Sequence, residues 1–128
     1  RRVSFSLGRD LFSDPLPRVA AVIYNFQRTK SKAVVDAIPD TGADVTCLPM
    51  DDCQDLELFL FPYYRGMSHP FGGAVRSVTF YAARIELDGG FYNAVVEPVA
   101  ESERLIGREV LNRMKVTFDG PSQTTTFD

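Results

Sequence analysis

The chain has 128 residues, 45% of them hydrophobic and 24% charged, and its formal net charge at pH 7 is −3. This length allows one domain, residues 1–128, with a real core, but not two catalytic lobes of independent fold. Nucleic-acid binding is not expected as the main task, because the chain has no surplus of Lys and Arg to neutralise phosphates. No apolar run approaches the roughly 20 residues that cross a bilayer, so we expect no membrane segment in this chain.

The first four predicted elements are strands. Residues 2–7 (RVSFSL) alternate apolar and polar side chains, which is the two-residue period of a half-buried strand. Residues 18–26 and 31–38 are rich in β-branched side chains and are joined by the polar stretch QRTK, so we expect them to form an antiparallel pair. The extended apolar pattern resumes at residues 45–49 (VTCLP).

The middle of the chain is expected to combine a helix, a loop and a long hairpin. Residues 50–59 predict either a short helix that opens on Asp51 or Asp52 or an irregular loop. Residues 61–76 mix aromatic residues, prolines and three glycines, which predicts a loop or the tip of a hairpin. Residues 74–87 and 91–100 flank an Asp-Gly-Gly turn and predict a long hairpin.

The C-terminal part first changes to a helical period and then returns to strands. Residues 105–115 have helical spacing, with Val110, Leu111 and Met114 on one face. Residues 116–127 predict a strand, a turn at Asp-Gly-Pro and a second strand, which would fold the end of the chain back on its own subunit. The predicted fold class is therefore mostly β, with one short C-terminal helix.

The cysteines and the single histidine narrow the possible chemistry. Cys47 and Cys53 fit neither a metal quartet nor a disulfide framework, and we expect both to be reduced structural thiols. A Ser/His/Asp or Cys/His nucleophile scheme would have to run through His69, which lies in the predicted loop. We therefore expect neither a metal site nor a cofactor.

Residues 34–49 (VVDAIPDTGADVTCLP) place three aspartates inside an apolar run. Burying a carboxylate without partners costs several kcal/mol, so such an aspartate requires a hydrogen-bonding scaffold or a function. Asp36, two positions before Ile38, is expected to face solvent. A DTGAD sequence is also compatible with an ordinary turn between strands. In that case the chain is a β domain with a coincidental motif, and it is expected to be a monomer.

Three segments of the sequence, taken together, resemble the motifs of a known protein family in their order and spacing. The DTGA of residues 40–43, the glycine-bearing GMSHPFGGAV of residues 66–75 and the ERLIGREVLNRMKV of residues 103–116 resemble, in this order, the active-site motif, the flap and the C-terminal helix region of retropepsin-like aspartic proteases. The likeness runs from about Arg18 to Phe118. It implies a single-domain acid protease fold with closed, barrel-like β-sheets, a flap hairpin and one short C-terminal helix.

The resemblance also implies a reaction and an assembly. In this family, two carboxylates share one proton; the ionised one activates a water and the protonated one polarises the scissile carbonyl. A chain of this length has a single DTG, so the resemblance implies a homodimer with Asp40 from each subunit at the two-fold axis. It assigns the catalytic loop to Asp40, Thr41 and Gly42 and implies an aspartic endopeptidase without metal or organic cofactor.

The same resemblance implies how a polypeptide substrate would be held. The substrate-binding positions it indicates are Ala43, Asp44, Val45, Phe71, Gly72, Gly73 and Ile106. Arg108 would support the loop by donating to the carboxylate of Asp44. Aromatic residues before the flap, Tyr63 and Tyr64, are candidates for covering the substrate, although aromatic side chains in a β domain are core by default.

Two features depart from the family pattern and favour an alternative. Pro39, directly before Asp40, has no N–H, so the strand entering the loop is expected to be unpaired or distorted there. Pro70 is expected to stiffen the flap. The alternative function is therefore a catalytically silent dimerisation or peptide-binding module with the same fold, which would bind peptides without cleaving them.

Overall fold

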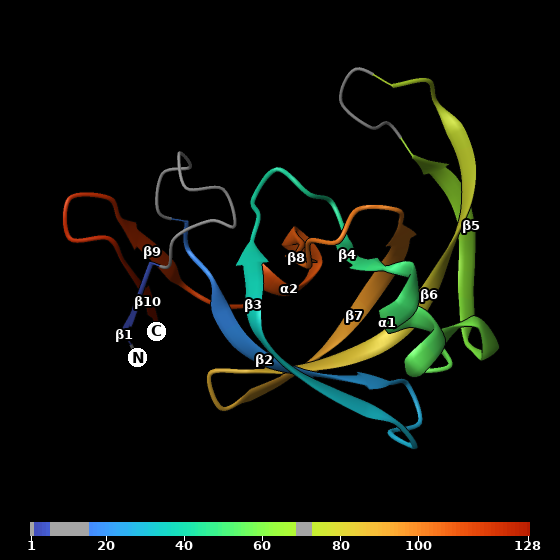
Figure 1. Ribbon diagram of the computed structural model, residues 1–128, viewed down its shortest axis with the longest axis horizontal. Helices are drawn as coiled ribbons and strands as arrows, with labels where there is room; N and C mark the ends of the chain where they lie inside the picture. The colour runs from blue at the N-terminus through green and yellow to red at the C-terminus, as the bar shows by residue number, and fades with distance from the viewer. Residues whose placement is uncertain (1, 6–15, 69–72) are drawn as a thin grey trace.

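The computed structural model describes residues 2–5, 16–68 and 73–128, which form ten strands, two short α-helices and one 3-10 turn (Figure 1). The mostly β fold class is thus confirmed. The strands are β1 (Arg2–Ser4), β2 (Val19–Asn25), β3 (Ser31–Pro39), β4 (Thr46–Pro49), β5 (Pro62–Ser68), β6 (Arg76–Leu87), β7 (Gly90–Val99), β8 (Leu105–Ile106), β9 (Val116–Asp119) and β10 (Thr124–Phe127). The helices are α1 (Met50–Asp55) and α2 (Arg108–Leu111), and the 3-10 turn is η1 (Leu58–Leu60).

Seven of the strands form one sheet that nearly closes on itself. Their order is β2-β3-β8-β4-β7-β6-β5, and β2 also pairs with β6. The sheet therefore closes as a barrel between β2 and β6, which removes two exposed edges, and β5 continues beyond the barrel as a partner of β6. In Figure 1, β5 and the adjoining part of β6 rise away from the barrel as a long hairpin arm.

The core lies inside this barrel and follows the two-residue period of its strands. In β2 the side chains of Val19, Ala21 and Ile23 are buried, whereas those between them are half-buried or exposed. Buried residues of β3, β6 and β7, together with Val110 and Leu111 of α2, belong to the same cluster. The predicted antiparallel pairing of residues 18–26 with 31–38 is confirmed by the β2–β3 register.

The predicted hairpin of β6 and β7 is also confirmed. The two residues of its turn, Asp88 and Gly89, have φ angles of 51° and 79°, and Leu87 pairs with Gly90. A two-residue hairpin turn with both φ angles positive matches the right-handed twist of the strands, and Asp-Gly is among the pairs that best tolerate it. Local turn chemistry therefore sets the register of the longest hairpin in the described part of the chain.

Two segments differ from the sequence-based expectation. Residues 62–68, expected as a loop or the tip of a hairpin, form strand β5, because β2 pairs with β6 only at residues 83–86 and leaves residues 76–81 of β6 free to pair. The expected helix over 105–115 shrinks to the four residues of α2, because residues 105 and 106 pair with β3 and β4 as strand β8. In both segments, pairing with distant strands overrides the local pattern.

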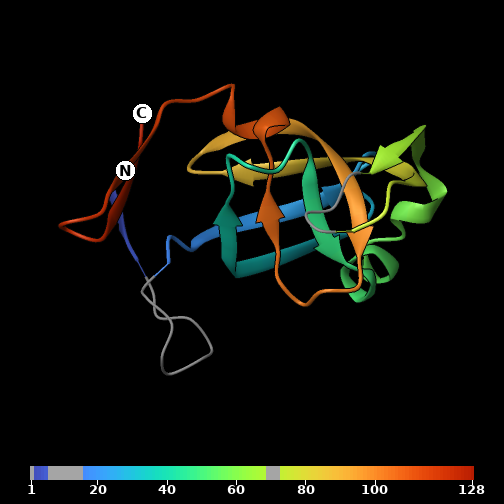
Figure 2. The same cartoon turned by 90° about the horizontal axis from the view of Figure 1, so that it is seen from above.

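The ends of the chain form a separate three-stranded sheet with the order β1-β10-β9. The predicted turn after Asp119 is present, and β9 and β10 pair as an antiparallel hairpin within the chain. Figures 1 and 2 show this sheet to one side of the barrel, with the N- and C-termini close together. Phe127 joins it to the barrel core.

Candidate active site

The DTG loop connects β3 to β4 and is shaped by hydrogen bonds around Asp40. The Asp40 N–H donates to the carbonyl of Ile106 in β8 over 2.9 Å, and its own carbonyl accepts from the N–H of Ala43 over 3.2 Å. The Gly42 N–H donates to Oδ1 of Asp40 over 2.8 Å. The half-buried carboxylate is therefore held by the loop that carries it.

Pro39 does not disturb this arrangement. It is buried in β3 and pairs with Ile106 in the parallel β3–β8 ladder. On either side of it, the Ile38 N–H donates to the carbonyl of Arg104, the residue before β8, over 2.8 Å, and the Asp40 N–H donates to that of Ile106 in β8 over 2.9 Å. Alternate residues of a strand direct their N–H groups to the same neighbour. The N–H that Pro39 lacks would therefore point to the other side of β3, away from β8. The expected unpaired or distorted strand entry is therefore wrong.

Arg108 ties the DTG loop to the start of α2. Its Nη1 donates to the carbonyl of Thr41 over 2.7 Å, and its Nη2 forms an ion pair with Asp44, as the resemblance implies. Its backbone N–H donates to the carbonyl of Ala43 over 2.9 Å. Three donors of one residue thus fix the loop, and the planar guanidinium suits the two-point contact.

Glu109 holds the other side of the loop. Its Oε2 accepts from the N–H groups of Thr46 in β4 and Val95 in β7 over 3.1 and 2.9 Å, and Oε1 has no hydrogen-bond partner among the described residues. Burial raises the pKa of Glu109 above its usual value, and the backbone N–H of Val95 and other hydrogen bonds offset part of this effect. The residue after Arg108 therefore bridges two strands of the barrel.

Gly107 is required by the close approach of α2 to the loop. A Cβ at Gly107 would lie 2.2 Å from the backbone carbon of Val45 and 2.4 Å from its oxygen. Gly107→Ala is therefore expected to lower the free energy of unfolding by about 3 kcal/mol or more, because the backbone has to move apart. Urea denaturation measures the loss. Gly120→Ala is the matched control, because a Cβ there has no neighbour within 4 Å; equal losses would contradict the prediction.

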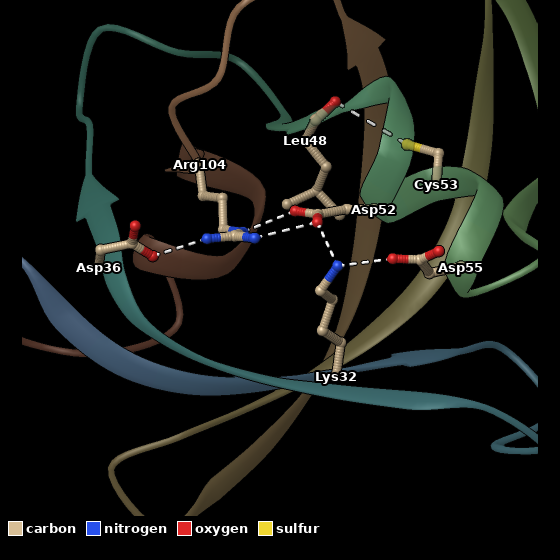
Figure 3. Close-up of polar contacts among 7 residues, drawn as sticks. All are labelled: Lys32, Asp36, Leu48, Asp52, Cys53, Asp55 and Arg104. Carbon is tan, nitrogen blue, oxygen red and sulfur yellow. Dashed lines mark hydrogen bonds and ion pairs between the residues drawn. The ribbon is translucent and has the colours of Figure 1, made fainter.

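A partly buried ionic network lies between α1 and β3, the strand that leads to Asp40 (Figure 3). Asp52 of α1 has 2% of its surface exposed and accepts from Arg104 Nε and Nη2 over 2.6 and 3.0 Å. Lys32 of β3 donates to Asp52 and Asp55, over 2.7 Å in each case. The remaining Arg104 nitrogen, Nη1, donates to Asp36 over 2.8 Å. Asp36, expected to face solvent, is therefore half-buried and paired.

The network links α1, β3 and the residue preceding β8. Burial by itself would raise the pKa of Asp52, but hydrogen bonds from Arg104 and Lys32 outweigh it and hold this pKa below its usual value. The hydrogen bond to Asp52 has the largest effect on Arg104 and raises the pKa of its guanidinium. Burial lowers this pKa and the hydrogen bond to Asp36 raises it, and the net change is an increase. Asp52 is therefore ionised, and its contacts fix β8 beside the end of β3.

A cleft of about 480 Å³ opens above the DTG loop. Its floor is formed by the loop and β4, and its roof by β5 and Phe80 of β6. Of the predicted site residues it contains Asp40, Gly42, Ala43, Asp44 and Val45. Thr41 is exposed on the same loop, and Gly73 is exposed beside the start of β6. Phe71 and Gly72 lie outside the described residues.

The position of Ile106 differs from the expectation. Ile106 is 2% exposed and belongs to the core, whereas its neighbour Leu105 is half-buried and lines the cleft. Successive side chains of a strand point to opposite faces, so a strand residue cannot fill both positions. The two tyrosines of β5 also differ in position, because Tyr64 lines the cleft and Tyr63 lines a different cavity.

Several cleft residues were not assigned to the site from the sequence, among them Cys47, Ser68, Glu97 and Val99. They come together because β4 and β7 run parallel, with Cys47 opposite Glu97, while Ser68 lies at the end of β5. No local pattern predicts this pairing. Both cysteines are free, as expected, and burial followed by the charge of Glu97 raises the pKa of the Cys47 thiol to about 12.

Another cavity, of about 630 Å³, lies away from the DTG loop. It is lined mainly by apolar side chains of β5, β6, β7 and the turns beside them, and Asp40 is not among its lining residues. The described residues contain no group of three or more His, Cys, Asp and Glu positioned to hold a metal ion. No helix in the part of the chain that the structure describes is long and apolar enough to span a membrane.

The fold has a known counterpart among solved structures. The sequence matches no protein-family model and no curated protein. The structure is similar to a chain of the foamy viral protease-reverse transcriptase in complex with an RNA/DNA hybrid, with a TM-score of 0.52 and 15% sequence identity. The likeness covers 77% of this chain but only 12% of that one. The chain therefore has a retropepsin-like fold.

Proposed function

We propose that this protein is an aspartic endopeptidase that acts as a homodimer of one retropepsin-like domain per chain. The observation that carries the proposal is the position of Asp40, whose half-buried carboxylate lies in a cleft between the DTG loop and strand β5. One carboxylate cannot serve as both general acid and general base in the same step, so the proposal requires a second Asp40 from a partner subunit.

In the proposed reaction the two carboxyl groups share one proton. The ionised one takes a proton from water as the water oxygen attacks the scissile carbonyl, and the protonated one donates to the carbonyl oxygen. The C–N bond then breaks as the amine takes a proton from one carboxyl group, while a hydroxyl of the tetrahedral intermediate returns its proton to the other, which regenerates the shared-proton state. The Gly42 N–H, which donates to Oδ1 over 2.8 Å, orients the carboxylate.

The substrate we propose is an extended polypeptide lying along the cleft. Strand β5 forms its roof, and an extended peptide satisfies its own backbone by strand-like hydrogen bonds. Ala43, Val45 and Leu105 would contact its side chains, and Asp44 its backbone. We also propose that Thr41 and Gly73 contact the partner loop and the substrate, respectively, in the assembled dimer.

Cleavage of a diverse peptide mixture between about pH 4 and 7 tests the proposal, because the shared proton places the optimum in that range. Products would be read by mass spectrometry for the natural chain and for Asp40→Asn. Cleavage by the natural chain that disappears in the variant is the expected result. Peptide binding by a dimer that cleaves nothing would instead favour the silent binding module, and a monomer that neither binds nor cleaves would favour the coincidental motif.

A further inference from the structure

We propose that Glu97 makes one subsite of the cleft selective for a cationic side chain, Lys or Arg, of the peptide. This inference rests on the proposed function and names its substrate class. It concerns a residue outside the DTG loop, the glycine-bearing segment and the C-terminal helix region, so none of the motifs discussed above predicts it. The argument has three parts: where the carboxylate lies, which charges surround it, and what walls stand beside it.

The carboxylate of Glu97 lies between the floor and the roof of the cleft. Glu97 belongs to β7 and is paired in register with Cys47 of β4, the strand that follows the DTG loop. Its Oε2 accepts a hydrogen bond from Oγ of Ser68, at the end of β5, over 3.1 Å. Glu97, Cys47 and Ser68 line the same cavity as Asp40. A peptide lying between β5 and the DTG loop therefore passes this carboxylate.

The charge of Glu97 is not balanced by a described cation. Three carboxylates line the cleft, those of Asp40, Asp44 and Glu97, and none of the described lining residues is Lys, Arg or His. Asp44 is neutralised by its ion pair with Arg108. None of the ion pairs among the described residues involves Glu97, and its hydrogen-bond donor there, Ser68, is uncharged.

Arg65 and Arg76 are close in sequence to the β5 residues that line the cleft, but neither of them lines it. Arg65 of β5 donates to Ser77 and Thr79 of β6, and together with Arg76 it lines a separate surface hollow. Of the β5 residues from 64 to 68, Tyr64, Gly66, Met67 and Ser68 line the cleft and Arg65 does not. A cation supplied by the substrate would therefore meet little competition from the described side chains.

The walls beside Glu97 suit the stem of a long cationic side chain. Val99 and Leu105 present apolar surface to the same cavity. Cys47 adds an uncharged wall, since its thiol remains protonated at neutral pH. Lys and Arg bury their methylene stems along apolar surface while the charged group contacts a carboxylate. An aliphatic side chain would contact the same walls but leave the charge of Glu97 without a cation, and that difference is the basis of the selectivity.

The experiment compares matched peptides that differ only by one charge. A peptide cleaved by the natural chain is resynthesised with Lys or with its uncharged analogue norleucine at each position in turn, and each pair competes in one reaction. We expect one position at which kcat/KM for Lys exceeds that for norleucine by about tenfold, with a ratio that falls as salt is added. In Glu97→Gln the ratio is expected to fall to about one.

Two control variants separate charge from structure. Glu86→Gln removes the same charge at an exposed site of β6 that does not line the cleft, and it is expected to keep the preference for Lys. Ser68→Ala removes the hydrogen bond that joins Glu97 to β5 but leaves the carboxylate, so it is expected to keep the preference as well. If Glu97 only anchored β5, Ser68→Ala and Glu97→Gln would alter the ratio alike, which would overturn the inference.

Failure of the inference is distinguishable from failure of the proposed function. Cleavage with no position that prefers Lys or Arg, or with a preference unchanged in Glu97→Gln, overturns the subsite and leaves the peptidase standing. Absence of cleavage overturns the peptidase, and the subsite is then decided by fluorescence anisotropy of labelled Lys and norleucine peptides on Asp40→Asn, with and without Glu97→Gln. Equal affinity for both peptides in both proteins overturns the subsite there too.

Discussion

Asp40→Asn is expected to lower kcat/KM for peptide cleavage by at least about 1,000-fold, because an amide neither accepts the proton of the attacking water nor supplies one to the carbonyl. The fold should persist. Asn keeps an oxygen for the Gly42 N–H, and the Asp40 N–H bond to Ile106 involves only the backbone. Thermal unfolding of the variant within a few degrees of the natural chain would show that the loss is chemical.

The same variant tests whether the catalytic unit contains two chains. If each active site needs both Asp40 carboxylates, a mixed dimer carries one carboxylate and one amide and is inactive. Unfolding and refolding the natural chain with an equal amount of Asp40→Asn is then expected to reduce specific activity per natural chain to about one half, because about one quarter of randomly formed dimers are fully natural. Dilution should lower specific activity by dissociating the dimer.

An active site within one chain gives a different result. The natural chains in the mixture would then retain their full specific activity, and dilution would have no effect. Sedimentation of the same samples would report a monomer at every concentration. That combination would leave the aspartic mechanism without its second carboxylate and would contradict the homodimer.

Asp52→Asn is expected to lower the free energy of unfolding by about 2–4 kcal/mol at neutral pH, because it removes the charge that Arg104 and Lys32 share. An amide keeps the size of the side chain but leaves two partly buried cations without their common partner. The matched control is Asp55→Asn. Its carboxylate is 62% exposed and contacts the same Lys32, so a loss below about 1 kcal/mol is expected.

The pH dependence of this loss has a definite sign. The pKa of Asp52 is held below the usual 3.8 in the folded protein, so folding favours the ionised form. Its contribution is complete above the unfolded-state pKa, near pH 4, and disappears as pH falls through the lower folded-state value. The difference in unfolding free energy between the natural chain and Asp52→Asn should therefore be constant above about pH 5 and narrow below pH 4.

Glu109 contributes with the opposite sign. Its raised pKa favours the protonated folded form, so its contribution is present at low pH and is lost as pH rises through the folded-state value. The contribution of Glu109 is the same in the natural chain and in Asp52→Asn, so it cancels when the two unfolding free energies are subtracted. Urea denaturation between about pH 2.5 and 7 measures both curves. A difference that grows as the pH falls would contradict the assignment of Asp52 as an ionised, paired carboxylate.

The residues that local chemistry controls were predictable from the sequence. The Asp88-Gly89 turn adopts positive φ angles because these residue types tolerate them, and the alternation in β2 and β3 follows from one buried face. The DTG motif located the loop that ends in the cleft, and the pairing of Arg108 with Asp44 followed from the resemblance. In each case the signal lies within a few residues or within a motif.

Other features depend on contacts between segments that are far apart in the sequence. Pro39 looked disruptive alone, but the β3–β8 ladder directs its missing donor away from the partner strand. Asp36 was paired by Arg104, a residue 68 positions away in the chain. Ile106 faced the core and Leu105 the cleft because β8 pairs with β3 and β4 in one particular register.

By itself, therefore, the sequence determined the β class, most strand positions, the hairpin turn and the place of the DTG motif, since each depends on the propensity or spacing of nearby residues. The tertiary structure alone decided which side chains line the cleft. Glu97 meets Cys47 only through the parallel pairing of β7 with β4, and Ser68 only through the β5 hairpin arm. The physical reason is that strand pairing brings together residues of large sequence separation, and a shift of one residue would turn each side chain to the opposite face.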